Sequence, residues 1–199
     1  MAARLYIVRH GNTFEKGDVV RRVGGRSDIS LSLSGRSQIQ ALAGHFAGQG
    51  MAFATIRSGP LRRTRETAEI IRTLQSAPPE TAIDLFLREI DYGPDEGKSE
   101  IEVVARLGQA ALDAWEQASI VPPGWRVDPQ AIIGNWQELF ARMRAVTGNH
   151  LIVTSNGVAR FALAAAGNGR PDRKLATGAY GVIELDGATV TVLSWNARP

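Results

Sequence analysis

The tripeptide Arg9-His10-Gly11 places a cation, an imidazole and a flexible backbone position directly after the apolar run of residues 5–8. If that run is a strand, the imidazole reaches the carboxyl edge of a sheet, where open α/β folds bind their ligands. The glycine lets the backbone approach a ligand closely, and the arginine offers a planar fork to phosphate oxygens. A histidine beside that fork is suited to be the nucleophile of a phosphoryl transfer. The alternative is a histidine that only caps the turn after a strand.

The composition narrows the class of ligand. The chain has 199 residues and a net charge of +3, and lysine supplies only Lys16, Lys98 and Lys174 of its 23 basic residues. The arginines are scattered along the chain, which favours a small anionic ligand over a nucleic acid. With no cysteine and only three dispersed histidines, neither a metal nor a cofactor is expected. No apolar stretch reaches the roughly 18 residues of a membrane span, and no signal-peptide pattern is present, so the expected location is the cytoplasm.

The apolar periodicity predicts alternating strands and helices. Strands are expected at residues 4–9, 53–57, 82–86 and 151–154, and helices at 34–49, 61–74, 99–119, 129–146 and 158–166. Asp186-Gly187, between the runs 181–185 and 189–195, is a hairpin signal. This order predicts an α/β fold, a three-layer α/β/α sandwich whose mainly parallel central sheet has an antiparallel edge strand from the C-terminal hairpin. One domain over residues 1–199 is expected, and the loop at 12–30 is long enough to be functional.

Five segments follow one another along nearly the whole chain: Arg9-His10-Gly11-Asn12-Thr13, residues 25–35, residues 58–68, Leu87-Arg88-Glu89 with Glu96-Gly97, and residues 153–157. In this order they resemble the motifs of the histidine phosphatase (phosphoglycerate-mutase-like) superfamily. The resemblance implies that His10 attacks phosphorus and carries a phosphohistidine, while Arg9 and Arg63 hold the phosphoryl oxygens. The attacking nitrogen must be neutral, so the other ring nitrogen is expected to donate to a local carbonyl. For Arg63 the alternative is a solvated charge on a helix.

The resemblance also implies that Glu89 is the general acid that protonates the departing oxygen and then the base that activates water. Such an acid needs a raised pKa, from burial or from the nearby phosphate. The acidic loop of residues 88–97 also holds the competing carboxylates Asp91, Asp95 and Glu96. The alternative is a loop that is merely solvated.

The chain departs from the family pattern at Asn156, where the family has a second histidine. Together with Gly157, the amide is still expected to bind phosphate, but it brings no positive charge. Charge-assisted hydrogen bonds contribute roughly 1.5–3 kcal/mol and neutral ones about 0.5–1.5. The missing charge is therefore expected to slow the reaction by roughly tenfold to a hundredfold without abolishing it. His45 and His150 lie elsewhere in the predicted elements and are expected to be structural.

One hypothesis is a charge swap, in which a cation from the loop after His10 replaces the missing one. The candidates are Lys16, Arg21, Arg22 and Arg26. Lys16 stands where the family usually has a phosphate-contacting asparagine. Substrate contacts are expected from the following residues of the same loop: Asn12, Thr13, Lys16, Arg22 and Gly25.

The sequence therefore favours a phosphomonoester hydrolase that acts through phosphohistidine on a small phosphorylated metabolite and needs no metal. Two alternatives stay open: a cofactor-dependent phosphoglycerate mutase, and a catalytically weakened protein that binds a phospholigand, which Asn156 motivates. Residues 97–148 are expected to form a helical, lid-like region, whose Trp115, Trp125 and Trp136 either cover the site or belong to the core. Neither nucleic acid nor a membrane is an expected partner, and a homodimer is left open.

Overall fold

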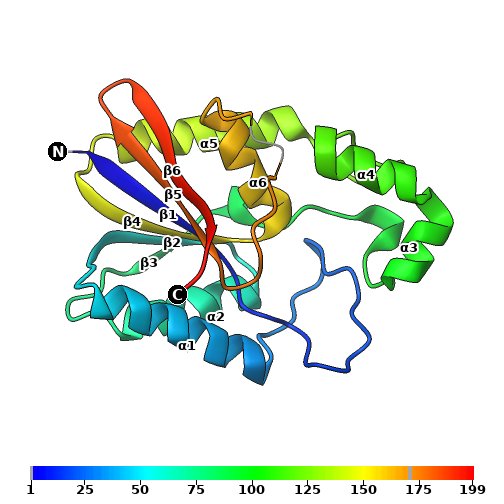
Figure 1. Ribbon diagram of the computed structural model, residues 1–199, viewed down its shortest axis with the longest axis horizontal. Coiled ribbons are helices and arrows are strands. Elements are labelled where there is room, and N and C mark those ends of the chain that lie inside the picture. Colours follow the sequence, from blue (N-terminus) through cyan, green and yellow to red (C-terminus); the bar gives the residue numbers. More distant parts are fainter. Residues whose placement is uncertain (1, 170–171) are drawn as a thin grey trace.

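A single mixed sheet forms the centre of the computed structural model, which describes residues 2–169 and 172–199. Its strand order is β3-β2-β4-β1-β5-β6 (Figure 1). The strands are β1 (Ala3–Arg9), β2 (Phe53–Ser58), β3 (Thr81–Ile83), β4 (Gly148–Thr154), β5 (Tyr180–Asp186) and β6 (Thr189–Ala197). The first four pair in parallel, whereas β5 runs antiparallel to β1 and β6 antiparallel to β5. The predicted parallel sheet with an antiparallel edge is confirmed.

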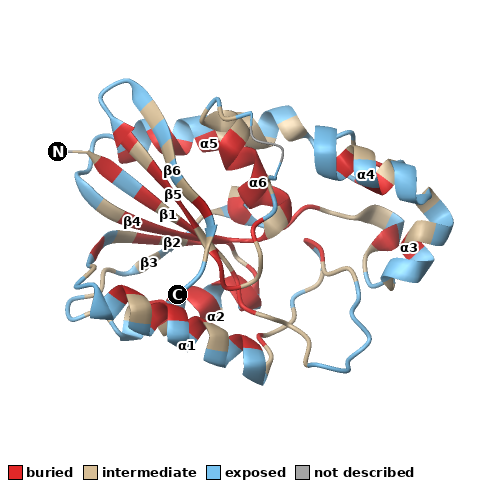
Figure 2. Ribbon diagram, in the orientation of Figure 1, coloured by how far each residue is buried: buried red, intermediate tan, exposed pale blue. Residues whose placement is uncertain are grey.

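Helices cover both faces of this sheet. On one face lie α1 (Leu33–Gly48) and α2 (Arg62–Thr73), and on the other α5 (Pro129–Met143) and α6 (Asn156–Ala165) (Figure 1). Leu5 and Ile7 of β1 belong to the apolar cluster that α5 and α6 share, and Val8 belongs to the cluster with α1 and α2. Successive side chains of a strand point to opposite faces, so both faces of β1 are buried (Figure 2). The predicted three-layer sandwich is confirmed.

Two short helices extend beyond the sheet. They are α3 (Glu100–Leu107) and α4 (Gln109–Ala118), which lie across from the loop that follows β1 (Figure 1). The prediction of one helix over 99–119 is wrong, because the chain breaks at Gly108, whose φ of +78° favours glycine. In the first of the two helices Ile101 is 83% exposed, whereas Val103 is buried.

The expected strand at 82–86 is also shorter in the structure. The ladder of β3 ends at Ile83, and Leu85–Leu87 form a 3-10 turn. Asp84 still contacts β2: its N–H donates to Ser58 O at 2.9 Å, and its carboxylate pairs with Arg57 at 2.8 Å. The turn buries Leu87 completely, so core packing overrides the local strand preference at this point.

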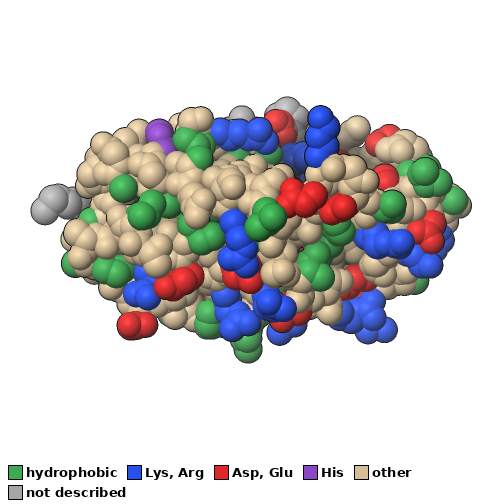
Figure 3. All heavy atoms as spheres, turned by 90° about the horizontal axis from the view of Figure 1, so that it is seen from below, with side chains coloured by type: hydrophobic (Ala, Val, Ile, Leu, Met, Phe, Trp, Pro, Cys, Tyr) green, Lys and Arg blue, Asp and Glu red, His purple; other side chains and the backbone are tan. Residues whose placement is uncertain are grey.

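The surface formed by α1 and α2 mixes charges of both signs (Figure 3). Ion pairs join Arg36 to Glu66 at 2.9 Å and Arg72 to Glu69 at 2.8 Å. Basic side chains on this face therefore alternate with acidic ones instead of forming a stripe. In the described part of the chain, every helix is too short or too polar to cross a membrane.

The parallel register of β1 and β4 brings the residues that follow these two strands to one edge of the sheet. Arg9 lies opposite Thr154, and the N–H of His10 donates to the carbonyl of Thr154 at 3.1 Å. The residues that follow the two strands, His10 and Asn156, therefore emerge together. Thr154 also anchors the acidic loop, because its Oγ1 donates to Leu87 O at 2.8 Å.

Candidate active site

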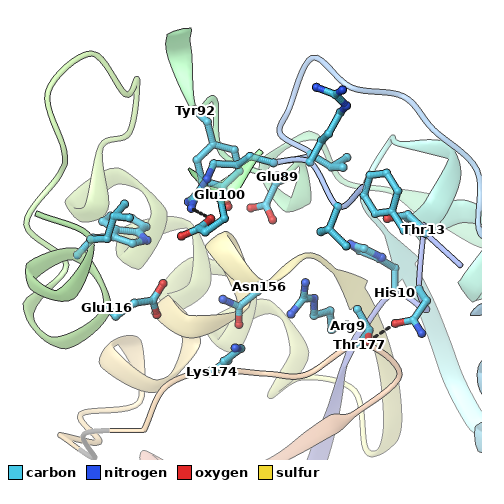
Figure 4. Close-up of a pocket in the computed structure, with 18 of the residues that line it drawn as sticks. Arg9, His10, Thr13, Glu89, Tyr92, Glu100, Glu116, Asn156, Lys174 and Thr177 are labelled. Carbon is cyan, nitrogen blue, oxygen red and sulfur yellow. Dashed lines mark hydrogen bonds and ion pairs between the residues drawn. The ribbon is translucent and has the colours of Figure 1, made fainter. Parts of the chain in front are cut away.

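A cavity of about 880 Å³ opens at this edge of the sheet. It lies between the loop after β1 and helices α3 and α4, and segments far apart in the sequence line it. Side chains of Arg9, His10, Glu89 and Asn156 converge on it (Figure 4). The volume falls within the usual range for sites that enclose small molecules.

His10 is held in the protonation state that a nucleophile requires. Its Nδ1 lies 2.8 Å from Gly11 O, and because a carbonyl only accepts, Nδ1 carries the proton. The Nε2 lone pair is then free for attack. Burial lowers the pKa of His10 well below its usual range, and the positive charges of Arg9 and Arg63 lower it further. The ring is therefore neutral at physiological pH.

Glu89 is buried in the same cavity, with 7% of its surface exposed. Burial raises the pKa of this carboxyl, and the charge of Arg63 opposes the rise only in part. One oxygen, Oε1, accepts the N–H of Ile90 at 2.9 Å, and Oε2 accepts that of Gly157 at 3.4 Å. The structure thus holds a carboxyl with a raised pKa in the same cavity as a neutral imidazole.

The two arginines expected at the phosphate differ in their placement. Arg9 lines the cavity, and its Nη1 donates to Leu175 O at 2.9 Å. Arg63 is completely buried and does not line the cavity. Its Nη1 and Nη2 donate to Ser27 O at 2.6 Å and Gly24 O at 3.2 Å. Arg63 is therefore not the solvated helix charge of the alternative, and its charge influences His10 from behind the cavity wall.

Asn156 and Gly157 begin helix α6 directly after β4. The side-chain oxygen of Asn156 accepts the N–H of Leu175 at 2.8 Å, which leaves the amide NH₂ free to donate toward the cavity. Gly157 does not line the cavity. Its lack of a side chain leaves room for the Glu89 carboxylate, which a Cβ at this position would overlap.

The expected substrate contacts divide into two groups. Four of them line the cavity, namely Asn12, Thr13, Lys16 and Arg22. Gly25 does not line it: its N–H donates to Ile90 O at 2.9 Å, and a Cβ on it would lie 2.5 Å from the carbonyl of Glu89. Gly25 therefore allows the backbone of the acidic loop to pass close by and has no contact with the cavity.

Most candidates for the charge swap are already paired. The Arg22 guanidinium bonds to Glu100 at 2.6 Å and lies over the rings of Tyr92 and Trp125. Arg26 pairs with Asp91 and Glu96 outside the cavity. Arg21 lines the cavity and donates to Gly97 O at 3.0 Å. Lys16 lines the cavity with no ion pair among the residues that the structure describes.

The competing carboxylates lie outside the cavity. Asp95 is buried and accepts from Trp125 Nε1 at 2.6 Å and from Arg106, while Asp91 and Glu96 pair with Arg26. Glu89 is therefore the one carboxylate of the acidic loop that lines the cavity within the described ranges 2–169 and 172–199.

Only part of the predicted lid region borders the cavity. Helices α3 and α4 do, through residues such as Trp115, whereas α5 packs against α6, with Trp136 buried and its Nε1 donating to Val158 O at 3.0 Å. Trp125 packs on edge against Trp115 at 5.4 Å. All three tryptophans are buried and belong to the apolar core, and Trp115 also borders the cavity.

His45 and His150 lie apart from the cavity. His150 is buried, and its ring bonds to Thr55 Oγ1 at 2.9 Å and Val146 O at 2.8 Å. His45 lies in the last turn of α1, within 3.4 Å of the Tyr180 hydroxyl.

Several cavity residues were missed by the sequence reasoning, namely Tyr92, Glu100, Asp113, Glu116, Lys174 and Thr177. Their approach depends on tertiary packing and carries no local signal. Among the residues described, no three His, Asp or Glu side chains are grouped so as to hold a metal ion.

Comparison with known proteins identifies the family of this chain. The family model of the histidine phosphatase superfamily (branch 1) matches residues 5–198. A probable phosphoglycerate mutase GpmB from Proteus mirabilis is 31% identical over 166 residues, which cover 78% of this chain and 70% of that protein. The bifunctional protein Rv2228c of Mycobacterium tuberculosis is 32% identical over 121 residues, or 61% of this chain, and the chain spans only about a third (32%) of that relative.

Solved structures share the fold over essentially the whole chain. Bacillus stearothermophilus YhfR is 29% identical, with a TM-score of 0.79 over 100% of this chain and 98% of that one. A mycobacterial glucosyl-3-phosphoglycerate phosphatase, Rv2419c, is 22% identical, with a TM-score of 0.82 over 99% and 100% of the two chains. The second similarity concerns the fold alone.

Proposed function

Because this chain belongs to the histidine phosphatase superfamily (branch 1), we propose that it is a phosphomonoester hydrolase that acts through a phosphohistidine on His10. One observation carries the proposal: a neutral imidazole, with Nδ1 bound to Gly11 O, shares a cavity with a buried Glu89 whose pKa is raised and with Arg9. The substrate is a small phosphorylated metabolite, as the cavity of about 880 Å³ indicates.

In the first step, Nε2 of His10 attacks phosphorus and the bond between phosphorus and the ester oxygen breaks. Glu89 transfers its proton to that oxygen, so that a neutral alcohol leaves. The imidazolium that forms keeps its Nδ1–H bond to Gly11 O. Arg9 and the amide of Asn156 stabilise the charge on the phosphoryl oxygens.

In the second step, a water molecule attacks phosphorus and the N–P bond breaks. The Glu89 carboxylate, left ionised by the first step, accepts a proton from the water. This returns His10 to the neutral form and Glu89 to the protonated form, and inorganic phosphate is released. Each group thus ends the cycle as it began.

Two other functions each have one observation in their favour. Similarity to a probable phosphoglycerate mutase favours a mutase, in which the phosphohistidine passes its phosphoryl group to a second substrate oxygen. The uncharged Asn156 favours a protein that binds a phosphate ester and turns it over poorly.

Hydrolysis of 4-nitrophenyl phosphate tests the proposal. Turnover is expected in the wild type and only at background level in His10→Ala, while His45→Ala, which alters a histidine outside the cavity, stays active. Phosphate-ester binding without turnover would favour the binding protein. Conversion of 3-phosphoglycerate to its 2-isomer would favour the mutase.

A further inference from the structure

Lys174 is a cavity-lining cation that the steps above do not use. Its side chain is exposed and lies beside Asn156 (Figure 4). No carboxylate within the described residues forms an ion pair with it. A solvated lysine would be unremarkable on an open surface, but this one belongs to the wall of the cavity that holds His10.

The backbone fixes where this lysine stands. The N–H of Leu175, the next residue, donates to Asn156 Oδ1 at 2.8 Å, and the carbonyl of Leu175 accepts from Arg9 Nη1 at 2.9 Å. Leu175 is completely buried. Two residues later, Thr177 Oγ1 donates to Asn12 Oδ1 at 2.5 Å. The segment that directly follows Lys174 is therefore tied to groups that surround His10.

The same bonds orient the neighbouring donors toward one space. Asn156 turns its oxygen to Leu175, so its NH₂ group faces the cavity. Arg9 lines the same cavity, with its Nη1 held on Leu175 O. Arg9, Asn156 and Lys174 therefore present two positive charges and an amide donor to one cavity, a combination suited to an anion.

The other cations that line the cavity either have partners of their own or lack a link to Asn156. Arg22 is paired with Glu100 and stacked on two aromatic rings, and Arg21 is bound to Gly97 O. Lys16 stands on the loop after β1 and has no bond to Asn156 or to Leu175 among the residues described.

We infer that Lys174 is a phosphate-binding residue, whose Nζ donates to the phosphoryl oxygens beside the amide of Asn156. The neutral amide supplies direction, and the lysine supplies the charge that the amide lacks. This inference rests on the proposed function only in taking the cavity to bind a phosphoryl group. It moves the source of the replacement charge from the loop after β1 to the segment between α6 and β5.

Equilibrium binding of orthovanadate and inorganic phosphate tests the inference directly, because neither ion has a leaving group. Lys174→Met is expected to weaken both by about tenfold to a hundredfold, as loss of a charge-assisted contact predicts. Lys174→Arg, which keeps the charge, is expected to retain most of the affinity. The matched control is Lys98→Met: Lys98 pairs with Glu102 outside the cavity, and its removal leaves binding unchanged.

A second experiment combines Asn156→His with Lys174→Met. If the two positions serve the same oxygens, Asn156→His recovers most of the affinity that Lys174→Met loses, so the effects are not additive. Strict additivity would contradict the inference. Unchanged melting temperatures in the single variants and in the double variant show that the fold is intact.

Other results would overturn the inference. Equal vanadate affinity in Lys174→Met and Lys98→Met would contradict it. So would a loss of affinity in Lys174→Met that is seen only with esters whose leaving group is anionic. If Lys16→Met loses vanadate affinity and Lys174→Met does not, the phosphate-binding cation is Lys16 of the loop after β1. If the wild type binds neither ion, no phosphoryl site exists for Lys174. If it binds vanadate but hydrolyses no ester, only the proposed function fails.

Discussion

His10 and Glu89 show how burial assigns opposite roles to two titratable groups. Burial disfavours the charged form of each, so the pKa of the imidazole falls and that of the carboxyl rises. In the proposed mechanism, the first group is the neutral nucleophile and the second the proton donor. The positive charges of Arg9 and Arg63 strengthen the effect on His10 and moderate it on Glu89.

Glu89→Gln is expected to impair hydrolysis according to the leaving group. An alkyl phosphate such as glycerol 2-phosphate needs a proton on the departing oxygen, and its kcat/KM, which reports the phosphorylation step, is expected to fall by roughly 10² to 10⁴. The nitrophenolate ion leaves readily without a proton, so kcat/KM for 4-nitrophenyl phosphate should fall much less. Glu96→Gln, in the same loop but outside the cavity, should leave the ratio of the two kcat/KM values unchanged. An equal loss of kcat/KM for both esters would contradict the role of Glu89 as acid.

At the scale of elements, the site depends on where strands end and helices begin. β1 delivers Arg9 and His10, and β4 delivers Asn156 at the start of α6. These ends were predictable because an apolar run stops at a polar residue in each case. The break at Gly108 and the 3-10 turn at Leu85–Leu87 were not, because tertiary packing decides them.

Gly157→Ala is expected to impair activity through Glu89. A methyl group there would overlap the Glu89 carboxylate and lie 2.9 Å from Ile90 Cγ1, so both side chains must shift. Turnover of an alkyl phosphate should fall by about tenfold or more, since misplacing a catalytic group by an ångström is costly. The free energy of unfolding should also fall, because Ile90 is buried and has to move.

Gly44→Ala is the matched control for this change. Gly44 is exposed on α1 with open space around its Cα, so the same added methyl should raise the free energy of unfolding and leave kcat unchanged. Full activity in Gly157→Ala would show that Gly157 does not fix the carboxylate.

At the scale of the whole molecule, the fold was predictable and the cavity was not. Alternating apolar runs specify a buried parallel sheet, and the hairpin at Asp186-Gly187 specifies its edge. The far wall of the cavity, with Lys174 and Glu116, is built by segments that meet only after folding. Likewise, no local pattern shows that Arg63 turns to the carbonyls of Gly24 and Ser27.

Buried histidines are expected to make the protein sensitive to acid. His10 and His150 both have a pKa lowered from the ordinary value of 6.5. Below that pH the unfolded chain binds protons that the folded chain does not, so stability is present above pH 6.5 and is lost as pH falls toward the folded pKa. Each histidine contributes up to about 1.4 kcal/mol per pH unit in this interval. Glu89, with its raised pKa, acts in the opposite sense.

Urea unfolding of wild type and His10→Gln isolates one of these contributions. Between pH about 7 and 5, the free energy of unfolding of the wild type should fall more steeply than that of the variant, by up to about 1.4 kcal/mol per pH unit. Parallel curves for the two proteins would mean that His10 titrates alike in the folded and unfolded chain, and that burial does not hold it neutral.

The most direct test is to quench the working enzyme with substrate labelled on phosphorus and to map the adduct. A phosphoryl group that is labile in acid and stable in base, on the peptide that contains His10, is the expected result. It should vanish in His10→Ala and accumulate when the second step is slowed. An active enzyme that never carries label on His10, or one whose label persists in His10→Ala, would contradict the account.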